Sequence, residues 1–179
     1  MIRNSVLVAD PPWKFGDALP GKGRGAAKNY HCLTVQQICD FGLPEMADDA
    51  WLFLWRVSSM MEEAYRVVRA WGFVPKSEIV WQKLTKTGKR WCGMGRYVRA
   101  SHETCIVAVR GRPVRLSASV RSRFAAKVPV DARGRYVHSA KPDAFYDIVE
   151  RLAPGPYFEM FARRPRPGWE QSGDQLAPG

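Results

Sequence analysis

The residues Asp10-Pro11-Pro12-Trp13 place a carboxylate, two prolines and an indole ring directly behind the apolar run 5–9. An aromatic amine is a poor nucleophile because its lone pair is delocalised into the ring, so an enzyme that alkylates it must hold its N–H groups with fixed acceptors. The Asp10 carboxylate and the Pro11 carbonyl are such acceptors, since the second proline supplies no N–H that would compete. Trp13 offers a ring face on which an unstacked base can lie.

The same four residues also form a good strand-terminating turn. A residue before proline avoids the helical region, and proline cannot extend a sheet ladder. The motif alone therefore leaves the amine clamp and the plain turn equally open, and its structural context has to decide between them.

The elements around the motif indicate a layered α/β fold. Apolar runs that are continuous rather than alternating predict strands covered on both faces. These runs are Val6–Ala9, Trp51–Trp55, Glu78–Trp81, Thr104–Val109 and Tyr157–Phe161.

Helical patterns lie between these runs. Capping boxes are expected at the starts of two helices, formed by Thr34 with Gln37 and by Ser59 with Glu62. Gly72 stands where the second helix should end, and a third helix is expected over residues 143–152, behind Pro142. Strands that alternate with helices predict a mostly parallel, doubly wound central sheet with helices on both faces. Ligands of such sheets bind at the carboxyl ends of strands, where Asp10 lies, and this favours the clamp.

Length and charge narrow the class of protein. The chain has 179 residues, 46% of them apolar, and is expected to form one domain over residues 1–179. Its formal net charge of +11, from 28 Lys and Arg against 17 Asp and Glu, favours a polyanionic partner, with nucleic acid as the leading candidate.

Three basic segments are expected to be loops. Residues 14–31 and 83–102 are long and punctuated by glycine, and residues 110–135 carry eight basic side chains against one acid. The second segment contains Lys83, Lys86, Lys89, Arg90, Arg96 and Arg99, with Trp91 and Tyr97 between them. Phosphate contact and base stacking are favoured over a merely solvated face. Residues 176–179 are expected to fray.

Several other chemistries are not supported. The four cysteines show no C-x-x-C spacing and the chain has three histidines, so no zinc or other metal site is expected. No complete dinucleotide fingerprint, P-loop or G-x-S-x-G elbow is present. The N-terminus shows no signal-peptide pattern and no apolar stretch is long enough to span a membrane, so a cytoplasmic protein with reduced thiols is expected.

An ordered series of motifs resembles the MT-A family of DPPW enzymes, the family of the mRNA adenosine-N6 methyltransferase catalytic subunit, over nearly the whole chain. The motifs are Asp10-Pro11-Pro12-Trp13, Trp51-Leu52-Phe53-Leu54-Trp55, Trp71-Gly72-Phe73, Glu78-Ile79-Val80-Trp81-Gln82-Lys83, His102-Glu103-Thr104-Cys105, His138-Ser139-Ala140-Lys141-Pro142-Asp143, Glu150-Arg151-Leu152, Glu159-Met160-Phe161-Ala162-Arg163, Gly168-Trp169 and Gly173-Asp174-Gln175-Leu176. Short members of this family from phages and bacteria act on DNA, which implies a bacterial or phage-infected host cell.

The resemblance implies a Rossmann-like methyltransferase fold with permuted motif order and S-adenosylmethionine as the methyl donor. Lys141 matches the family lysine that meets the cofactor's carboxylate, and Asp10 also lies near its ammonium group. Arg163, Asp174 and Gln175 match residues around the cofactor ribose. Asp174 stands where the family usually has asparagine, so it can accept a hydrogen bond there but cannot donate one.

Two further residues are assigned on mixed grounds. Tyr30 aligns with an aromatic residue beside the family's target-base pocket. Glu159 lies in an apolar strand, where a buried carboxylate needs a partner. Arg163 is within reach if the strand bends, and we expect an ion pair linked to the cofactor site rather than a purely structural one.

The predicted function is methyl transfer from S-adenosylmethionine to the N6 amine of adenine in nucleic acid, with DNA favoured over RNA and no metal required. Asp10, Pro11, Pro12 and Trp13 would be the catalytic residues. The substrate-binding residues would be Trp13, Tyr30, Lys83, Lys89, Arg90, Arg96 and Arg99. The alternatives are RNA as substrate, a non-catalytic nucleic-acid-binding subunit, and methylation of cytosine N4. A homodimer or a partner subunit is also considered, because no separate nucleic-acid-binding domain is expected.

Overall fold

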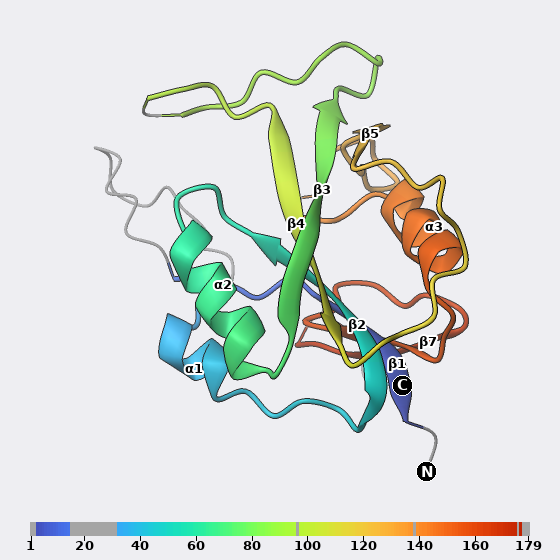
Figure 1. Cartoon of the computed structure of the whole chain (residues 1–179). Coiled ribbons are helices and arrows are strands. Elements are labelled where there is room, and N and C mark those ends of the chain that lie inside the picture. The colour runs from blue at the N-terminus through green and yellow to red at the C-terminus, as the bar shows by residue number, and fades with distance from the viewer. Residues whose placement is uncertain (1–2, 15–31, 96, 138, 175, 177–179) are drawn as a thin grey trace.

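The computed structural model describes residues 3–14, 32–95, 97–137, 139–174 and 176. Within these ranges the chain forms three helices and one seven-stranded sheet (Figure 1). The strands are β1 (Asn4–Ala9), β2 (Met46–Arg56), β3 (Val74–Leu84), β4 (His102–Arg110), β5 (Arg123–Lys127), β6 (Tyr157–Met160) and β7 (Trp169–Ser172). The helices are α1 (Val35–Cys39), α2 (Met61–Ala70) and α3 (Asp143–Leu152). No helix within the described ranges has both the length and the apolar content needed to cross a bilayer.

The strand order β5-β3-β4-β2-β1-β6-β7 gives a mostly parallel sheet, as predicted. Only β4 runs against its neighbours, pairing antiparallel with both β2 and β3, while the other four neighbouring pairs are parallel. The start of β4 therefore lies at the same edge of the sheet as the ends of β1, β2 and β3. In this register Thr104 faces Arg56, and His102 faces Gln82.

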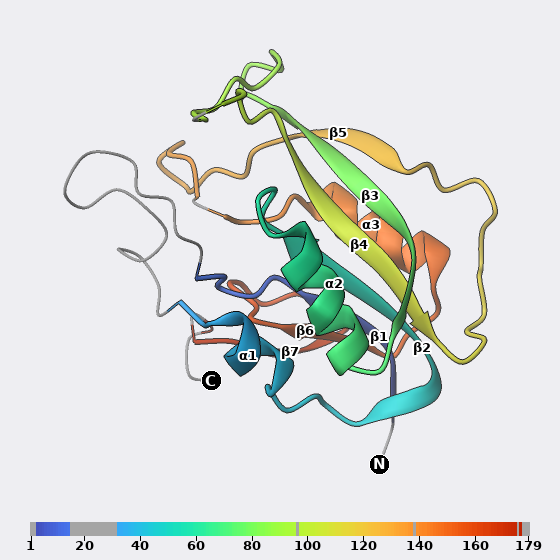
Figure 2. The same cartoon turned by 60° about the vertical axis from the view of Figure 1, so that its left-hand side comes forward.

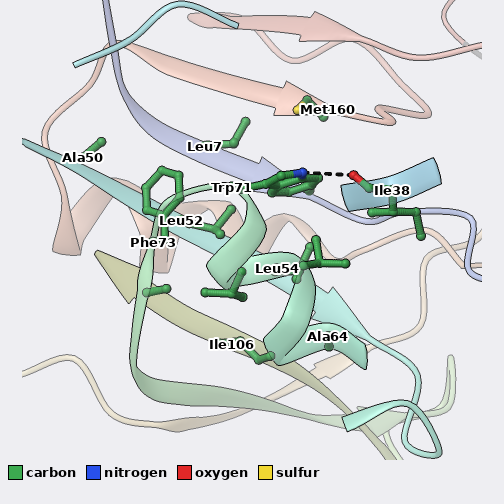
Figure 3. Packing of buried hydrophobic residues seen from close by; sticks show 14 of the residues in the cluster. Leu7, Ile38, Ala50, Leu52, Leu54, Ala64, Trp71, Phe73, Ile106 and Met160 are labelled. Atoms are coloured by element: carbon green, nitrogen blue, oxygen red, sulfur yellow. Dashed lines mark hydrogen bonds between the residues drawn. The ribbon is translucent and has the colours of Figure 1, made fainter. Parts of the chain in front are cut away.

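Helices cover both faces of the sheet, as predicted (Figure 2). Side chains of β1 alternate between the two faces: Leu7 and Ala9 pack in the core with α1 and α2, whereas Val6 and Val8 pack in the core with α3. In the first of these cores the Trp71 indole N–H donates to the Ile38 carbonyl at 3.0 Å (Figure 3). β1 is thus buried on both sides, which explains its continuous apolar sequence.

The helix starts agree only in part with the predicted capping boxes. Thr34 caps α1 with the expected reciprocal bonds to Gln37. The box expected for Ser59 is wrong, because α2 has Met60 as its N-cap and no side-chain cap bond. Met60 is buried in the core, and its packing sets the helix start one residue later. Gly72 follows the end of α2 with φ +78, a conformation that favours glycine.

Four of the five predicted strands are too short, the predicted strand 157–161 extends one residue beyond β6, and two strands are missing from the prediction. β5 and β7 lie at the two edges of the sheet. β5 alternates, with Arg123, Ala125 and Lys127 exposed, so it contains no continuous apolar run. The predicted loop 110–135 is therefore wrong over 123–127. The predicted loop 83–102 is also too long, because Lys83 belongs to β3 and His102 begins β4.

Candidate active site

The turn after β1 is held by backbone hydrogen bonds. The Trp13 N–H donates to the Pro11 carbonyl at 2.9 Å, and the Leu33 N–H donates to the Pro12 carbonyl at 2.8 Å. The expectation that nothing competes for the Pro11 carbonyl is wrong, since the chain itself uses one of its two lone pairs. The motif is a turn, and this turn also directs the Asp10 side chain into a cavity.

Trp13 is a core residue. Its side chain is only 4% exposed, and its indole N–H donates to the Trp55 carbonyl at 3.1 Å. The open stacking face predicted for Trp13 is therefore not present, although part of the side chain lines the cavity. The indole anchors the turn to the end of β2 and so helps to position Asp10.

The cavity beside Asp10 has a volume of about 210 Å³. It lies at the edge of the sheet where β1, β2 and β3 end and β4 begins. Charged residues from six segments reach it: Asp10, Arg56, Lys83, Glu103, Lys141 and Arg163. The carboxyl ends of strands thus form the site, as predicted for a sheet of this class.

Charges of alternating sign run through the wall of this cavity. Lys141 Nζ lies 2.7 Å from Asp10 Oδ2 and 3.1 Å from Glu103 Oε2. Lys83 Nζ lies 2.5 Å from Glu103 Oε1. Arg163 Nη2 lies 3.8 Å from Asp10 Oδ2. Each acid is therefore placed between two bases, and the chain of charges carries one excess positive charge.

This pairing keeps the buried groups ionised. Burial by itself would lower the pKa of Lys141, but the carboxylates of Asp10 and Glu103 outweigh it and raise that pKa. Burial by itself would raise the pKa of Glu103, but Lys141 and Lys83 outweigh it and lower that pKa to about 2. The Lys141 ammonium also lies 4.9 Å from the centroid of the buried Trp55 ring. Lys141 and Glu103 are therefore both charged at neutral pH.

Two residues beside the site adopt a backbone conformation that L-residues rarely take. Ser139 has φ 62 and Phe161 has φ 61. Such conformations cost about 1–3 kcal/mol each and cluster at functional sites. The Ser139 carbonyl accepts a hydrogen bond from Lys141 Nζ at 3.2 Å. The left-handed turn thus places an additional acceptor on the buried ammonium.

Glu159 is buried as expected, but the ion pair predicted with Arg163 is wrong. The Glu159 carboxylate accepts from the Tyr146 hydroxyl at 2.6 Å and from Gln171 Nε2 at 2.7 Å. β6 ends at Met160, and the chain then turns at Phe161 so that Arg163 extends toward Asp10. Because burial dominates and both donors are neutral, the pKa of Glu159 is raised.

The basic residues predicted to contact substrate have different environments. Lys83 lies in β3 and pairs with Glu103, so its predicted placement in a loop is wrong. Lys89, Arg90 and Arg99 are exposed on the connection between β3 and β4, which extends well beyond the sheet (Figures 1 and 2). Asp174 is exposed and does not line the cavity. Tyr30, Arg96 and Gln175 lie outside the described residues.

Glu103 is a site residue that sequence reasoning missed. The signal was available, because Glu103 directly precedes the apolar run 104–109, just as Glu159 interrupts another apolar run. Ser139 and Tyr146 carried no comparable signal, since their roles arise from a left-handed backbone and from a helix packed over β6.

The charges suit a ligand that carries both signs. Lys141 and Arg163 can meet a carboxylate, and Asp10 can meet an ammonium group. Among the residues that the structure describes, no group of three metal-ligating side chains is assembled. The arrangement therefore fits the amino-acid end of a small molecule next to a carboxylate acceptor.

The sequence profile of the family described as MT-A70 matches residues 4–175. The chain is 31% identical over 183 residues to the N(6)-adenosine-methyltransferase catalytic subunit METTL3 of Homo sapiens. It is 29% identical over 181 residues to the N(6)-adenosine-methyltransferase MT-A70-like protein of Drosophila melanogaster. It is also 26% identical over 193 residues to the type II methyltransferase M.MunI of Mycoplasma sp.

The relatives differ in how much of their own length is matched. The alignments cover 96% of this chain and 28% of the human protein, and 96% of this chain and 27% of the fly protein. The alignment with the Mycoplasma protein covers 97% of this chain and 78% of that protein. The chain thus spans little more than a quarter of the length of the first two relatives.

Proposed function

This chain belongs to the MT-A70 family, and from that premise we propose that it methylates the N6 amine of adenine in nucleic acid, with S-adenosylmethionine as the methyl donor. DNA is the proposed substrate in preference to RNA. The match over residues 4–175 supports a single methyltransferase domain. Target selection would rest on the basic surface, on a second copy or on a partner subunit.

The state of the Asp10 carboxylate carries this proposal. Its Oδ2 atom accepts from Lys141 at 2.7 Å, whereas its Oδ1 atom accepts no hydrogen bond from any residue that the structure describes. One oxygen is thus anchored while the other remains available at the wall of the cavity. A fixed acceptor of this kind is what an aromatic amine needs, because it stabilises the positive charge that develops on nitrogen.

The residues of the cavity fit the proposed cofactor by their charge. Lys141 and Arg163 would hold its carboxylate, and Asp10 would lie beside its ammonium group. When bound, S-adenosylmethionine supplies an electrophilic methyl group on its sulfonium sulfur. The chain itself contributes placement and charge: Asp10 Oδ1 accepts an N6 hydrogen, and the second lone pair of the Pro11 carbonyl is left for the other hydrogen.

The test compares the wild type with Asp10→Asn, and with Asp48→Asn as a matched control on an exposed acid. Each protein is incubated with labelled cofactor and with DNA and RNA oligonucleotides of the same sequence, and the products are digested to nucleosides. The wild type should yield N6-methyladenine, mainly from DNA. Asp10→Asn should lower the rate by about 100- to 1000-fold, the usual effect of one fixed electrostatic contact.

Folding and cofactor affinity of Asp10→Asn are measured in parallel. The assignment of Asp10 is refuted if the variant folds, binds the cofactor and methylates as fast as the wild type. Methylated cytosine as the product would replace adenine N6 by cytosine N4. Nucleic-acid binding without methyl transfer by the wild type would identify a non-catalytic subunit.

A further inference from the structure

A second cavity opens next to the one that contains Asp10. Its volume is about 370 Å³. The two cavities share Lys83 and His102, at the end of β3 and the start of β4. Beyond these two residues the second cavity is lined by Arg90 and Trp91 from the β3–β4 connection and by Arg123 from the edge strand β5. A ligand that extends past the Asp10 cavity on this side would enter it directly.

The charge of this cavity is positive and is not neutralised. Lys83, Arg90 and Arg123 line it, and no acidic side chain does. Lys83 already pairs with Glu103. Arg90 and Arg123, by contrast, make no ion pair and no side-chain hydrogen bond with any residue in the described part of the chain. Two guanidinium groups that face one cavity without a partner suit an anion with several oxygens, such as a phosphate.

The backbone holds these residues in place. Arg90 forms a β-bridge with Leu84, and the Trp91 N–H donates to the Lys83 carbonyl at 3.0 Å. Arg123 is paired with Val80 on the opposite side of β3. The cavity is therefore built on both flanks of one strand, and little backbone ordering remains to be done when a ligand binds.

Trp91 adds an aromatic surface to the cationic one. Its ring packs edge-on against Tyr136, with the ring centroids 5.0 Å apart and an interplanar angle of 90°. Unlike Trp13, which is buried in the core, Trp91 is partly exposed and lines the cavity. A planar base can stack on such a ring. The neighbouring cations and ring together match a nucleotide rather than an acidic peptide, which has no base to stack.

We propose that this cavity binds the nucleotide next to the target adenine, with Arg90 and Arg123 on its phosphate and Trp91 against its base. The proposal rests on the proposed function, because the first cavity must hold the adenine. The strand would then cross from one cavity to the other over Lys83 and His102. Part of the affinity for the strand would thus come from Arg123, in the segment that the sequence analysis had placed in a loop.

The test uses the full chain with Arg90→Ala, Arg123→Ala and Trp91→Ala. Arg115→Ala is the matched control, because Arg115 is exposed in the segment before β5 and does not line the cavity. Binding of fluorescent single-stranded oligonucleotides is measured at several salt concentrations. Each of the two cavity arginine variants should make the dependence of log affinity on log salt less steep, by at most about 0.7, the value for one phosphate. Trp91→Ala should weaken binding by about 5- to 150-fold, as for one lost base stack.

Methylation supplies a second measurement. KM should rise in the three cavity variants for an oligonucleotide, but not for a single adenosine nucleotide, which cannot reach the second cavity. Replacing one phosphate next to the adenine by an uncharged methylphosphonate should raise the KM of the wild type, and should raise that of Arg123→Ala by a smaller factor because only Arg90 still meets the phosphate. Cofactor affinity and thermal unfolding should match the wild type in all variants.

The outcomes separate the two proposals. If the wild type binds oligonucleotides with the expected dependence on Arg90 and Arg123 but transfers no methyl group, the proposed function fails and the nucleotide site stands. If the wild type methylates DNA and the three variants behave like Arg115→Ala, the nucleotide site is refuted. The nucleotide site would also be refuted if the three cavity variants lost binding to an acidic peptide while they still bound the oligonucleotide.

Discussion

Replacing Glu103 by glutamine should destabilise the protein in a way that depends on pH. Glutamine keeps the size of the side chain and can still accept hydrogen bonds, but it cannot neutralise Lys83 and Lys141. The Glu103 side chain is 26% exposed, so it is largely shielded from solvent. Breaking a buried ion pair from one side costs about 3–5 kcal/mol, because the partner charge is left uncompensated.

The shifted pKa leads to a similar magnitude. The ion pairs lower the pKa of Glu103 from 4.5 to about 2, and a displacement of this size corresponds to about 3 kcal/mol of stability at neutral pH. As the pH falls, the unfolded chain takes up this proton first, so the contribution is lost between the unfolded and the folded pKa. About 2 kcal/mol of it should disappear between about pH 6 and about pH 3.

The assay is urea unfolding of the wild type and Glu103→Gln, followed by tryptophan fluorescence at a series of pH values. Other carboxylates titrate in the same range, but they contribute equally to both proteins and cancel in the difference. Glu78→Gln is the control, because Glu78 lies 3.7 Å from Arg56 and is half-exposed, so its loss should cost less than about 1 kcal/mol. A difference between wild type and Glu103→Gln that stays constant down to about pH 3 would refute the reasoning.

Two further predictions concern the scaffold. Thr34→Ala should lower the free energy of unfolding by about 1 kcal/mol, because it removes the capping bond of α1. Ser59→Ala should change the free energy of unfolding by less than about 0.5 kcal/mol, since Ser59 caps no helix. Equal losses for the two variants in chemical denaturation would contradict this prediction. Trp13→Phe should cost about 1–3 kcal/mol, because the buried Trp55 carbonyl loses its indole donor, and an unchanged melting temperature would show that the indole is dispensable.

Much of the fold could be predicted because the central strands are buried on both faces. Such strands are continuous apolar runs, and each of the five predicted runs overlaps an observed strand, with only Phe161 falling outside. The two edge strands could not be found in this way. β5 has one solvated face and is stabilised by its pairing with β3, which is a tertiary contact and leaves no continuous apolar signal in its own sequence.

Site residues could be predicted where a charged residue lies next to an apolar run or to prolines in the sequence. They were missed where only the pairing of strands brings them to the site. Asp10, Lys141 and Arg163 do meet at one cavity. Glu103 reaches them because β4 runs antiparallel to β2 and β3, so that its first residues lie beside the last residues of its neighbours. Strands expected to be parallel would have placed Glu103 at the opposite edge. The direction of a strand is not encoded in its own apolar run.

The same antiparallel strand explains how Asp10 can be both anchored and available. A buried ammonium requires a counter-charge, and if Asp10 were the only one, both of its oxygens would tend to be drawn to Lys141. Glu103 supplies a second carboxylate 3.1 Å from that ammonium. Lys141 is therefore neutralised without needing all of Asp10, and Oδ1 of Asp10 remains for a substrate. It follows that Asp10→Asn still leaves Lys141 with Glu103 as its counter-charge, whereas Glu103→Gln removes a counter-charge from Lys141 and also leaves Lys83 without its ion pair.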